Sequence, residues 1–483
     1  MRCRYGMENA RERGWCQAAR GILADMRKTV NIIGAGLAGS EAALQLADRG
    51  VSVRLYEMRP ETATPVHETA DCAELVCSNS LKSLKPESAA GMLKSELSAL
   101  GSRLIDFAFE SKVDAGGALA VDRTLFSGAV TDAVRNHPLI DYTVAQVCDP
   151  SVLPAADACI LASGPLTSDG LADWIKRTTG SGNMAFFDAA APIVMADSLD
   201  MEVLFRQSRY ESDAVGDYLN APFTREQYES FIGELVAAER VIARDFETRD
   251  LFQACQPIEE IARKGVDAPR FGTLKPVGLT DPVTGRRPWA ALQLRAENAE
   301  CTAYNLVGFQ TNLTFPEQRR VFRLIPGLEH AEFARYGVMH RNTFIQAPVL
   351  LDSELRLRNV AIDDGRCPVY VAGQLSGTEG YCEAIASGLV CALNAFARLS
   401  GIDVRPLPQT TAFGALLRYA TDPQTRDYQP MHVNFGIMPP LDVHIRNKGQ
   451  RYAAYAQRGA DALADYVASL RTCGLVSCAP SEF

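Results

Sequence analysis

A cysteine with polar and cationic neighbours lies in the segment DCAELVCSNSLKSL, residues 71–84. Cys77 is followed by Ser78 and Asn79, both common helix-capping residues, and by Lys82. A thiolate is a strong nucleophile, and helix N-termini and nearby cations favour the thiolate over the thiol. The segment therefore predicts a reactive thiol at Cys77, at the start of a helix.

The alternative for Cys77 is a buried structural thiol, which is the commoner fate of a cysteine. Cys72 lacks the Ser-Asn pair that follows Cys77, and we assign it as structural. The predicted helix rests on an apolar stripe of Leu93, Leu97 and Leu100, which ends at Gly101.

The segment KTVNIIGAGLAGSEAALQLADRGVSVRLYEMRP, residues 28–60, supplies the elements that would place such a thiol beside a cofactor. A short apolar strand leads into a GxGxxG loop, a helix and a second strand over residues 51–56. Glycines let the backbone approach a pyrophosphate at a helix N-terminus, and an acid after the second strand accepts from ribose hydroxyls. A tight turn without a ligand is the alternative, but strand, loop, helix and acid agree with a dinucleotide site. The residues expected there are Gly34, Ala35, Gly36, Leu37, Ala38, Gly39, Glu57 and Arg59.

A second glycine-rich segment, CPVYVAGQLSGTEGYCEAIASGLVCALNAFARL, spans residues 367–399. It predicts a late strand, a loop and a helix, the arrangement that closes the FAD site of large flavoproteins and that NAD dehydrogenases do not need. We therefore expect FAD, with contacts from Gly373, Gln374, Gly377 and Gly380.

The two cofactor segments lie far apart in the chain, which indicates a discontinuous domain. We predict an α/β protein with a Rossmann-like, two-dinucleotide-binding FAD domain over residues 27–180 and 330–402 and an inserted α/β domain over residues 181–329. Residues 403–483 are expected to form helices that pack on the FAD domain, with a loose tail. Residues 1–26 are expected to be a disordered extension.

The composition narrows the class of protein. With 483 residues, 47% of them hydrophobic, the chain can bury a large core, and we expect neither a membrane-spanning helix nor a signal peptide. Without these two features we expect a cytoplasmic location. The thirteen cysteines include no CxxC pair, so we expect no metal site. A net charge of -9 disfavours indiscriminate binding to nucleic acid, although residues 285–288, 317–323 and 444–452 form local basic clusters.

Several long motifs resemble one family. Besides the two glycine-rich segments these are AELVCSNSLKS, PIEEIARKGVDAPRFGTLKPVGLTDPVTGRRPWAALQLRAEN, YNLVGFQTNLTFPEQRRVFRLIPGLEHAEFARYGVMHRNTFI and TAFGALLRY. They are similar to those of the folate- and FAD-dependent tRNA (uracil-5-)-methyltransferases, relatives of the GidA-type flavoproteins. The resemblance runs from about residue 28 to about residue 455.

The resemblance implies a reaction and its partners. It implies reductive methylation of uridine C5 in the T-loop of tRNA, with 5,10-methylenetetrahydrofolate as carbon donor and NADPH or NADH as reductant. Cys77 matches the Cys-Ser-Asn motif of the family and is the expected catalytic thiol. Asn79, His340, Arg341 and Asn342 are expected on the substrate side. We expect a monomer or a weak homo-oligomer.

The chain departs from the family at one functional position. Members carry a second cysteine in an Asn-Cys-Pro segment, and here that segment reads YLNAPF, with Ala221 at the cysteine position. Cys77 then acts alone, or another thiol such as Cys255 replaces the missing one. Three other hypotheses stay open: the same chemistry on a ribosomal RNA uridine, a flavoprotein oxidoreductase without an RNA substrate, and an RNA-binding relative without catalysis.

Overall fold

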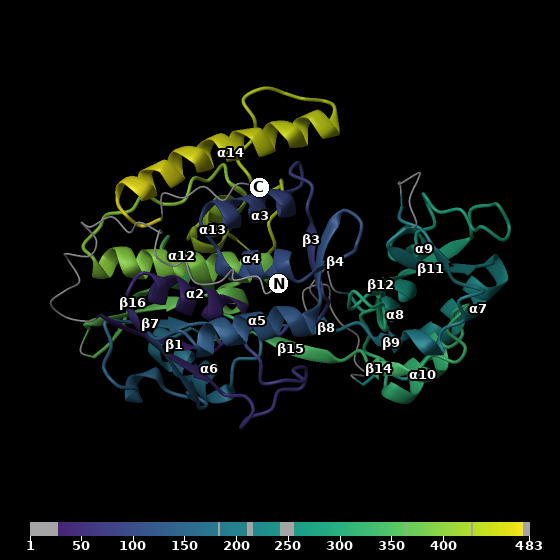
Figure 1. Ribbon diagram of the computed structural model, residues 1–483, viewed down its shortest axis with the longest axis horizontal. Coiled ribbons are helices and arrows are strands. Elements are labelled where there is room, and N and C mark those ends of the chain that lie inside the picture. The colour runs from purple at the N-terminus through teal and green to yellow at the C-terminus, as the bar shows by residue number, and fades with distance from the viewer. Residues whose placement is uncertain are drawn as a thin grey trace, which may run out of the picture.

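A six-stranded sheet forms the centre of the larger of two lobes (Figure 1). The computed structural model describes residues 28–181, 184–209, 216–241, 256–363, 365–426 and 428–476. Neighbouring strands of the sheet are parallel, except that the edge strand β16 runs antiparallel to β17. In spatial order the strands are β16 (Arg356–Ile362), β17 (Cys367–Val371), β7 (Ala158–Leu161), β1 (Thr29–Ile33), β2 (Ser52–Glu57) and β6 (Ile140–Val144).

Two helices that start at the glycine-rich segments pack directly against each other. These are α2 (Leu37–Asp48) and α12 (Tyr381–Leu399). A side chain at Gly388 of α12 would collide with the backbone of Ala38, so glycine at this position permits the close approach. By length and composition α12 is apolar enough to cross a membrane, but 83% of its most apolar stretch is buried inside this lobe.

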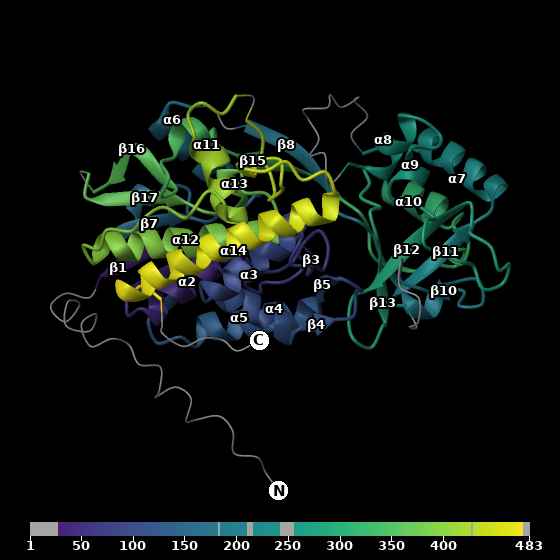
Figure 2. The same ribbon diagram turned by 90° about the horizontal axis from the view of Figure 1, so that it is seen from above.

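Further helices cover α2 and α12. They are α3 (Ala89–Ala99), α4 (Arg103–Glu110), α5 (Arg123–Arg135), α13 (Ala412–Thr421) and α14 (Lys448–Thr472). Helix α6 (Asp169–Thr179) follows β7, and α11 (Ala347–Leu350) precedes β16. Figure 2 shows α14 lying across the outside of the lobe, above α12 and α3. Helices α13 and α14 are the two helices that the structure describes after residue 403.

The smaller lobe is built on an antiparallel sheet with its own core. Its strands, in spatial order, are β10 (Phe205–Arg206), β11 (Tyr218–Phe223), β12 (Ala290–Ala296), β13 (Ala303–Leu306), β9 (Ile193–Met195) and β14 (Phe333–Arg335). Its helices are α7 (Arg225–Ala237), α8 (Ile258–Arg263), α9 (Ala268–Phe271) and α10 (Phe315–Phe322). Buried aromatic side chains, among them Phe231, Phe309 and Phe322, fill the space between sheet and helices.

Two small sheets lie where the lobes meet (Figure 1). Strand β8 (Met184–Ala189) pairs with β15 (Met339–Phe344), and β3 (Ser80–Ser83) and β4 (Lys112–Val113) flank β5 (Ala118–Val121). Because β14 belongs to the sheet of the smaller lobe, the predicted domain boundary at residue 330 comes too early. The predicted α/β class with a Rossmann-like sheet is confirmed; residues 1–26 lie outside the described part of the chain.

Candidate active site

The glycine loop between β1 and α2 is shaped by close backbone contacts. Gly34 has a φ of +101°, and a side chain there would lie 2.5 Å from the carbonyl oxygen of Ala162. A side chain at Gly39 would collide with the carbonyl oxygen of Gly34. At Gly36, by contrast, an added methyl group would meet no protein atom within 4 Å. Gly36 therefore faces open space at the start of α2, where a ligand's phosphates can approach.

The N-termini of α2 and α12 border the same cavity. It has a volume of about 360 Å³ and is lined from the first segment by Gly34, Gly36, Leu37 and Ala38, and from the second by Gly373, Gln374, Gly380 and Tyr381. Neither helix has a side-chain cap on its first N–H groups. Two uncapped helix N-termini facing one cavity make a site for an anionic chain such as a pyrophosphate.

Three of the predicted cofactor residues do not line the cavity. They are Ala35, Gly39 and Gly377. A side chain at Gly377 would collide with the hydroxyl of Tyr428, which donates to the carbonyl of Ser376 at 2.8 Å. Gly39 and Gly377 are thus required for packing behind the cavity wall, and the direct contacts fall on their neighbours.

Glu57 lies at the end of β2 and lines the same cavity. One carboxylate oxygen accepts from the backbone N–H of Ala35 at 2.8 Å, and the other accepts from Arg59 Nε at 2.8 Å. Burial alone would raise the pKa of Glu57, but the hydrogen bond and the charge of Arg59 outweigh burial and lower it. Oε1 also accepts from the backbone N–H of Arg59 at 3.1 Å, so Oε2 is the oxygen that can still accept from a ribose hydroxyl.

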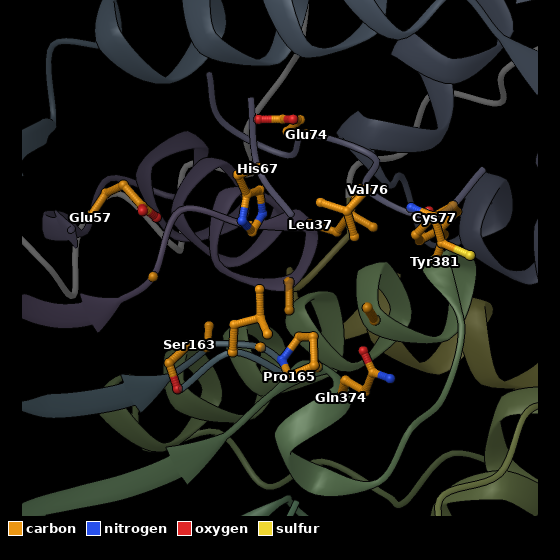
Figure 3. Close-up of a pocket in the computed structure, with 18 of the residues that line it drawn as sticks. Leu37, Glu57, His67, Glu74, Val76, Cys77, Ser163, Pro165, Gln374 and Tyr381 are labelled. Atoms are coloured by element: carbon orange, nitrogen blue, oxygen red, sulfur yellow. The ribbon is translucent and has the colours of Figure 1, made fainter. Parts of the chain in front are cut away.

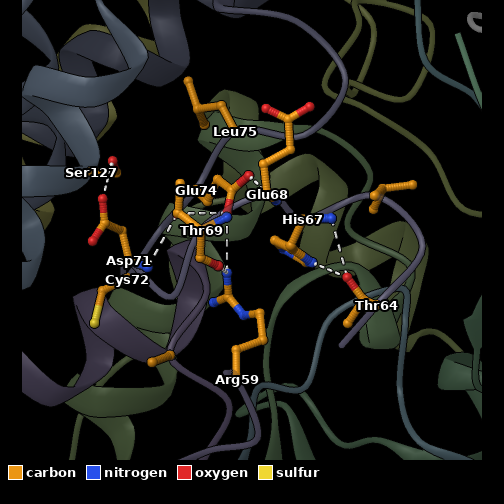
Figure 4. A network of polar contacts seen from close by, with 12 residues as sticks. Arg59, Thr64, His67, Glu68, Thr69, Asp71, Cys72, Glu74, Leu75 and Ser127 are labelled. Carbon is orange, nitrogen blue, oxygen red and sulfur yellow. Dashed lines mark hydrogen bonds and ion pairs between the residues drawn. The ribbon is translucent and has the colours of Figure 1, made fainter. Parts of the chain in front are cut away.

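A loop after β2 carries a polar network that borders the cavity (Figure 4). Arg59, which pairs with Glu57, also pairs with Glu74, with 3.3 Å between its Nη1 and Oε2 of Glu74. Glu74 in turn accepts from the backbone N–H groups of Glu68 and Thr69. Arg59, Glu74 and His67 all line the cavity. The network therefore fixes this loop against the cavity at the position of His67.

His67 is a cavity residue that the sequence analysis missed. Its Nδ1 lies 2.7 Å from the hydroxyl of Thr64, which also accepts from the backbone N–H of His67 at 3.1 Å. Burial, assisted by the charges of Arg59 and Arg335, lowers the pKa of His67 to about 4. The ring is therefore neutral at pH 7. In the sequence it is an isolated histidine without a motif, so only the folded loop brings it to the cavity.

Cys77 lies in the same cavity as the glycine loop (Figure 3). In this view Glu57 and Cys77 lie on opposite sides, with His67 between them and Tyr381 beside Cys77. The hydroxyl of Tyr381 accepts from the backbone N–H groups of Cys77 and Ser78 at 2.8 and 3.0 Å. Cys77 Sγ is 3.7 Å from the carbonyl oxygen of Ala189. The half-buried thiol is thus held by α12 at one end of the cavity.

The predicted helix start after Cys77 is wrong. Ser80–Ser83 form strand β3, which pairs with β5, and helix α3 begins at Ala89 with Ser88 as its cap. The helix N-terminus that contacts the Cys77 segment is instead that of α12, whose first residue is Tyr381. Burial raises the pKa of the Tyr381 phenol, so the hydroxyl is protonated at pH 7 and keeps its own proton to donate.

Cys72 is fully buried, and burial raises the pKa of its thiol to about 11. These properties agree with a structural thiol.

Asn79 was expected on the substrate side, but the structure places it away from the cavity. It is fully buried, its amide donates to the carbonyls of Val121 and Ala296, and its oxygen accepts from Arg295 at 2.7 Å. Asn79 thus joins the Cys77 loop to strand β12 of the smaller lobe and does not line the cavity.

His340, Arg341 and Asn342 lie on β15, where they pair with Asp188, Phe187 and Phe186 of β8. Asn342 is fully buried and is not a cavity residue. The side chains of His340 and Arg341 lie outside the described part of the structure.

Ala221 lies on β11, opposite Leu292 of β12, and is fully buried in the core of the smaller lobe. It does not line the cavity that contains Cys77. The second thiol position of the family is therefore a core position in this structure. Cys255 lies outside the described residues.

In two of the three basic clusters, some of the cationic side chains are engaged by contacts within the protein. In the cluster over 317–323, Arg320 pairs with Glu317 and Glu234, and Arg319 donates to the hydroxyl of Tyr336 at 2.7 Å. In the cluster over 444–452, the guanidinium of Arg451 donates to the carbonyl of Ile445. These contacts reduce the free positive charge expected from the sequence.

Comparison with known proteins agrees with this geometry. The model of the family described as "Glucose inhibited division protein A" matches residues 29–403. The structure of GidA from Aquifex aeolicus superposes with a TM-score of 0.67 at 16% identity, covering 94% of this chain and 74% of GidA, which shows a shared fold.

Curated relatives are much more similar in sequence. The protein named "Methylenetetrahydrofolate--tRNA-(uracil-5-)-methyltransferase TrmFO" of Geobacter sulfurreducens is 51% identical over 426 residues, which cover 88% of this chain and 96% of the relative. The protein of the same name from Symbiobacterium thermophilum is 50% identical and covers 90% of this chain and 96% of the relative. The predicted family is confirmed: the chain belongs to the TrmFO family of methylenetetrahydrofolate--tRNA-(uracil-5-)-methyltransferases, within the GidA-type flavoproteins.

Proposed function

We propose that this protein methylates C5 of a uridine in the T-loop of tRNA, with 5,10-methylenetetrahydrofolate as carbon donor, FAD as cofactor and NADPH or NADH as reductant. One observation carries the proposal. The cavity that both dinucleotide segments border also contains a half-buried cysteine, Cys77, at the end opposite Glu57. A nucleophile and a redox cofactor site thus share one enclosure.

The residues fit FAD. The open space at Gly36 and the uncapped N-termini of α2 and α12 suit the pyrophosphate, and Glu57 suits the adenosine ribose. When bound, FAD supplies the hydride that converts a one-carbon methylene unit to a methyl group, and the reduced nicotinamide restores that hydride.

Cys77 acts on the uracil ring. Uracil C5 is a poor nucleophile, but attack of the Cys77 thiolate on C6 forms a C–S bond and moves the C5–C6 π electrons onto C5 and O4 as an enolate. The enolate carbon then attacks the electrophilic one-carbon unit derived from the folate. Loss of the C5 proton then expels the folate nitrogen and leaves a methylene group on C5. Addition of a hydride to this methylene carbon gives the methyl group, restores the C5–C6 double bond and expels the Cys77 thiolate.

Tyr381 positions this nucleophile. Its phenol receives both backbone N–H groups at Cys77 and Ser78, and Asn79 is tied to Arg295 and Ala296 directly after them. The loop is thus anchored to α12 on one side and to the smaller lobe on the other. Because the loop is already fixed, less conformational entropy is lost when Cys77 attacks the ring.

The buried place of Ala221 supports catalysis by Cys77 alone and disfavours an inert relative, because the substitution leaves the lining of the cavity unchanged. The other cysteine of the lining, Cys382, is a poor nucleophile, because burial raises the pKa of its thiol to about 11. We further propose that the protein acts in the cytoplasm as a monomer or weak homo-oligomer.

Isotope-labelled methylenetetrahydrofolate tests the function. Purified protein with FAD and NADPH or NADH should transfer label to uracil in a tRNA transcript, and Cys77→Ala should transfer none. A ribosomal RNA fragment in parallel identifies the alternative substrate. Label that comes only from S-adenosylmethionine, or none in either RNA, would overturn the proposal.

A further inference from the structure

A buried carboxylate with an unused acceptor site lines the cavity near Cys77. Glu383, in the first turn of α12, is 1% exposed. Its Oε1 accepts from the backbone N–H of Val433 at 3.2 Å, whereas its Oε2 has no hydrogen-bond partner among the described residues. A buried acceptor without a donor is costly, so this atom calls for an explanation.

Helix capping does not explain Glu383. An acid three residues after the N-cap often accepts from the N-cap backbone, but α12 has no side-chain cap bond. The carboxylate instead lies over the Cα of Gly380, where any side chain would collide with Oε2. Gly380 and Glu383 both line the cavity. The free oxygen is therefore at the helix end that faces the cavity.

A donor lies beside the other oxygen of the same carboxylate. Lys82, which also lines the cavity, has its Nζ 3.7 Å from Oε1 of Glu383, and its side chain is 46% exposed. Lys82 has a φ of +68°, a conformation that is uncommon outside glycine, and its backbone N–H donates to Ser80 Oγ at 3.2 Å. Strand β3 thus places an ammonium donor beside a carboxylate acceptor.

We propose that Glu383 and Lys82 recognise a lactam edge, which is a ring N–H adjacent to a ring C=O, at the Cys77 end of the cavity. Glu383 Oε2 accepts from the ring N–H, and the Lys82 ammonium donates to the neighbouring carbonyl oxygen. A carboxylate and an ammonium side by side match this donor and acceptor pattern, whereas two donors or two acceptors would not. The site takes a ring of this class and rejects one whose nitrogen carries a methyl group.

This inference rests on the proposed function, because the flavin, the uracil and the pterin of the folate all carry such an edge. N-methylation distinguishes the three sources. Binding is measured for FAD against N3-methyl-FAD, for an RNA T-loop against one with N3-methyluridine at the target, and for tetrahydrofolate against its N3-methyl derivative. For the ring that is read, methylation should weaken binding to the wild type by about tenfold or more, since a hydrogen bond to a charged group is lost.

Glu383→Gln should bind the parent ring more weakly and lose most of this discrimination. Glu96→Gln is the matched control, because Glu96 is also buried but caps α13 outside the cavity lining; it should discriminate as the wild type does. Lys82→Met should weaken binding of the parent ring by a similar factor. Because the Lys82 side chain is partly exposed, this variant keeps the test open even if Glu383→Gln folds poorly.

The inference is overturned if no ring is discriminated by the wild type, or if Glu383→Gln and Lys82→Met leave binding and discrimination unchanged. These measurements need no methyl transfer. A wild type that discriminates but does not methylate would therefore refute the proposed function and leave the lactam site standing.

Discussion

The hydroxyl of Tyr381 lies 2.8 Å from the backbone nitrogen of Cys77, so the start of α12 holds a loop that is 304 residues away in the sequence. The helix whose N-terminus faces the cofactor cavity thus also positions the thiol. Binding of the cofactor and placement of the nucleophile are coupled through one side chain.

Tyr381→Phe tests this coupling. Without the phenol oxygen, the N–H groups of Cys77 and Ser78 lose their acceptor, and we expect a loss of about 1–3 kcal/mol in the free energy of unfolding. Methylation should fall by about tenfold to hundredfold because the thiol is less well placed, while FAD stays bound. Tyr370→Phe is the control, because its fully buried hydroxyl has no partner among the described residues. A changed alkylation rate of Cys77 in Tyr381→Phe alone would separate positioning from general destabilisation.

Single methyl groups added at three glycines should have three different effects. Gly36→Ala meets no protein atom, so we expect a folded protein that binds FAD weakly, because the methyl occupies the space for the phosphates. Gly39→Ala collides with the backbone of Gly34 and should fail to fold. Gly128→Ala on α5 also has open space and should be about 0.5–1 kcal/mol more stable. Flavin content and thermal unfolding measure all three, and full FAD occupancy in Gly36→Ala would refute the phosphate assignment.

Ala221→Cys restores the residue of the family but should not raise methylation. The added sulfur enters a fully buried core position and should destabilise the smaller lobe by about 1 kcal/mol. Methylation rates and urea unfolding of the variant and the wild type measure the two effects. Faster methylation would show that this position reaches the substrate during the reaction.

His67 should make stability depend on pH. Its pKa is about 4 in the folded chain, below the ordinary value of 6.5, so between these values the unfolded chain binds more protons. Through His67, the free energy of unfolding therefore has its full value above pH about 6.5 and decreases as the pH falls toward about 4. Urea unfolding of the wild type and His67→Gln from pH 4 to 8 should show a difference that changes only in that window. A difference that is constant with pH would contradict a neutral, buried His67.

Local sequence pattern was sufficient to predict the cofactor segments. The strands, the turns and the helices around Gly34 and Gly373 follow from apolar periodicity and glycine spacing, and both segments border the cavity. Gly39 and Gly377 show the limit of this reasoning, because spacing alone does not distinguish a glycine that contacts a ligand from one that permits packing.

Contacts between distant segments account for what was missed. Ser78 and Asn79 have the types of helix caps, yet pairing of β3 with β5 and the bonds of Asn79 to β12 draw this segment into a strand. Tyr381 belongs to the second glycine-rich segment, but its partner Cys77 is remote in the chain. His67 reaches the cavity only through the loop network around Arg59. No local pattern carries these relationships.

The central claim is that Cys77 is the thiol that attacks the uracil ring, and 5-fluorouridine tRNA tests it most directly. Fluorine at C5 cannot leave as a proton, so a stalled adduct should remain on the attacking sulfur, and peptide mass spectrometry should find it on Cys77. Cys77→Ala should keep its fold and its FAD, form no adduct and transfer no methyl group. An adduct on Cys255 or another cysteine, or methylation by Cys77→Ala at the wild-type rate, would contradict the account.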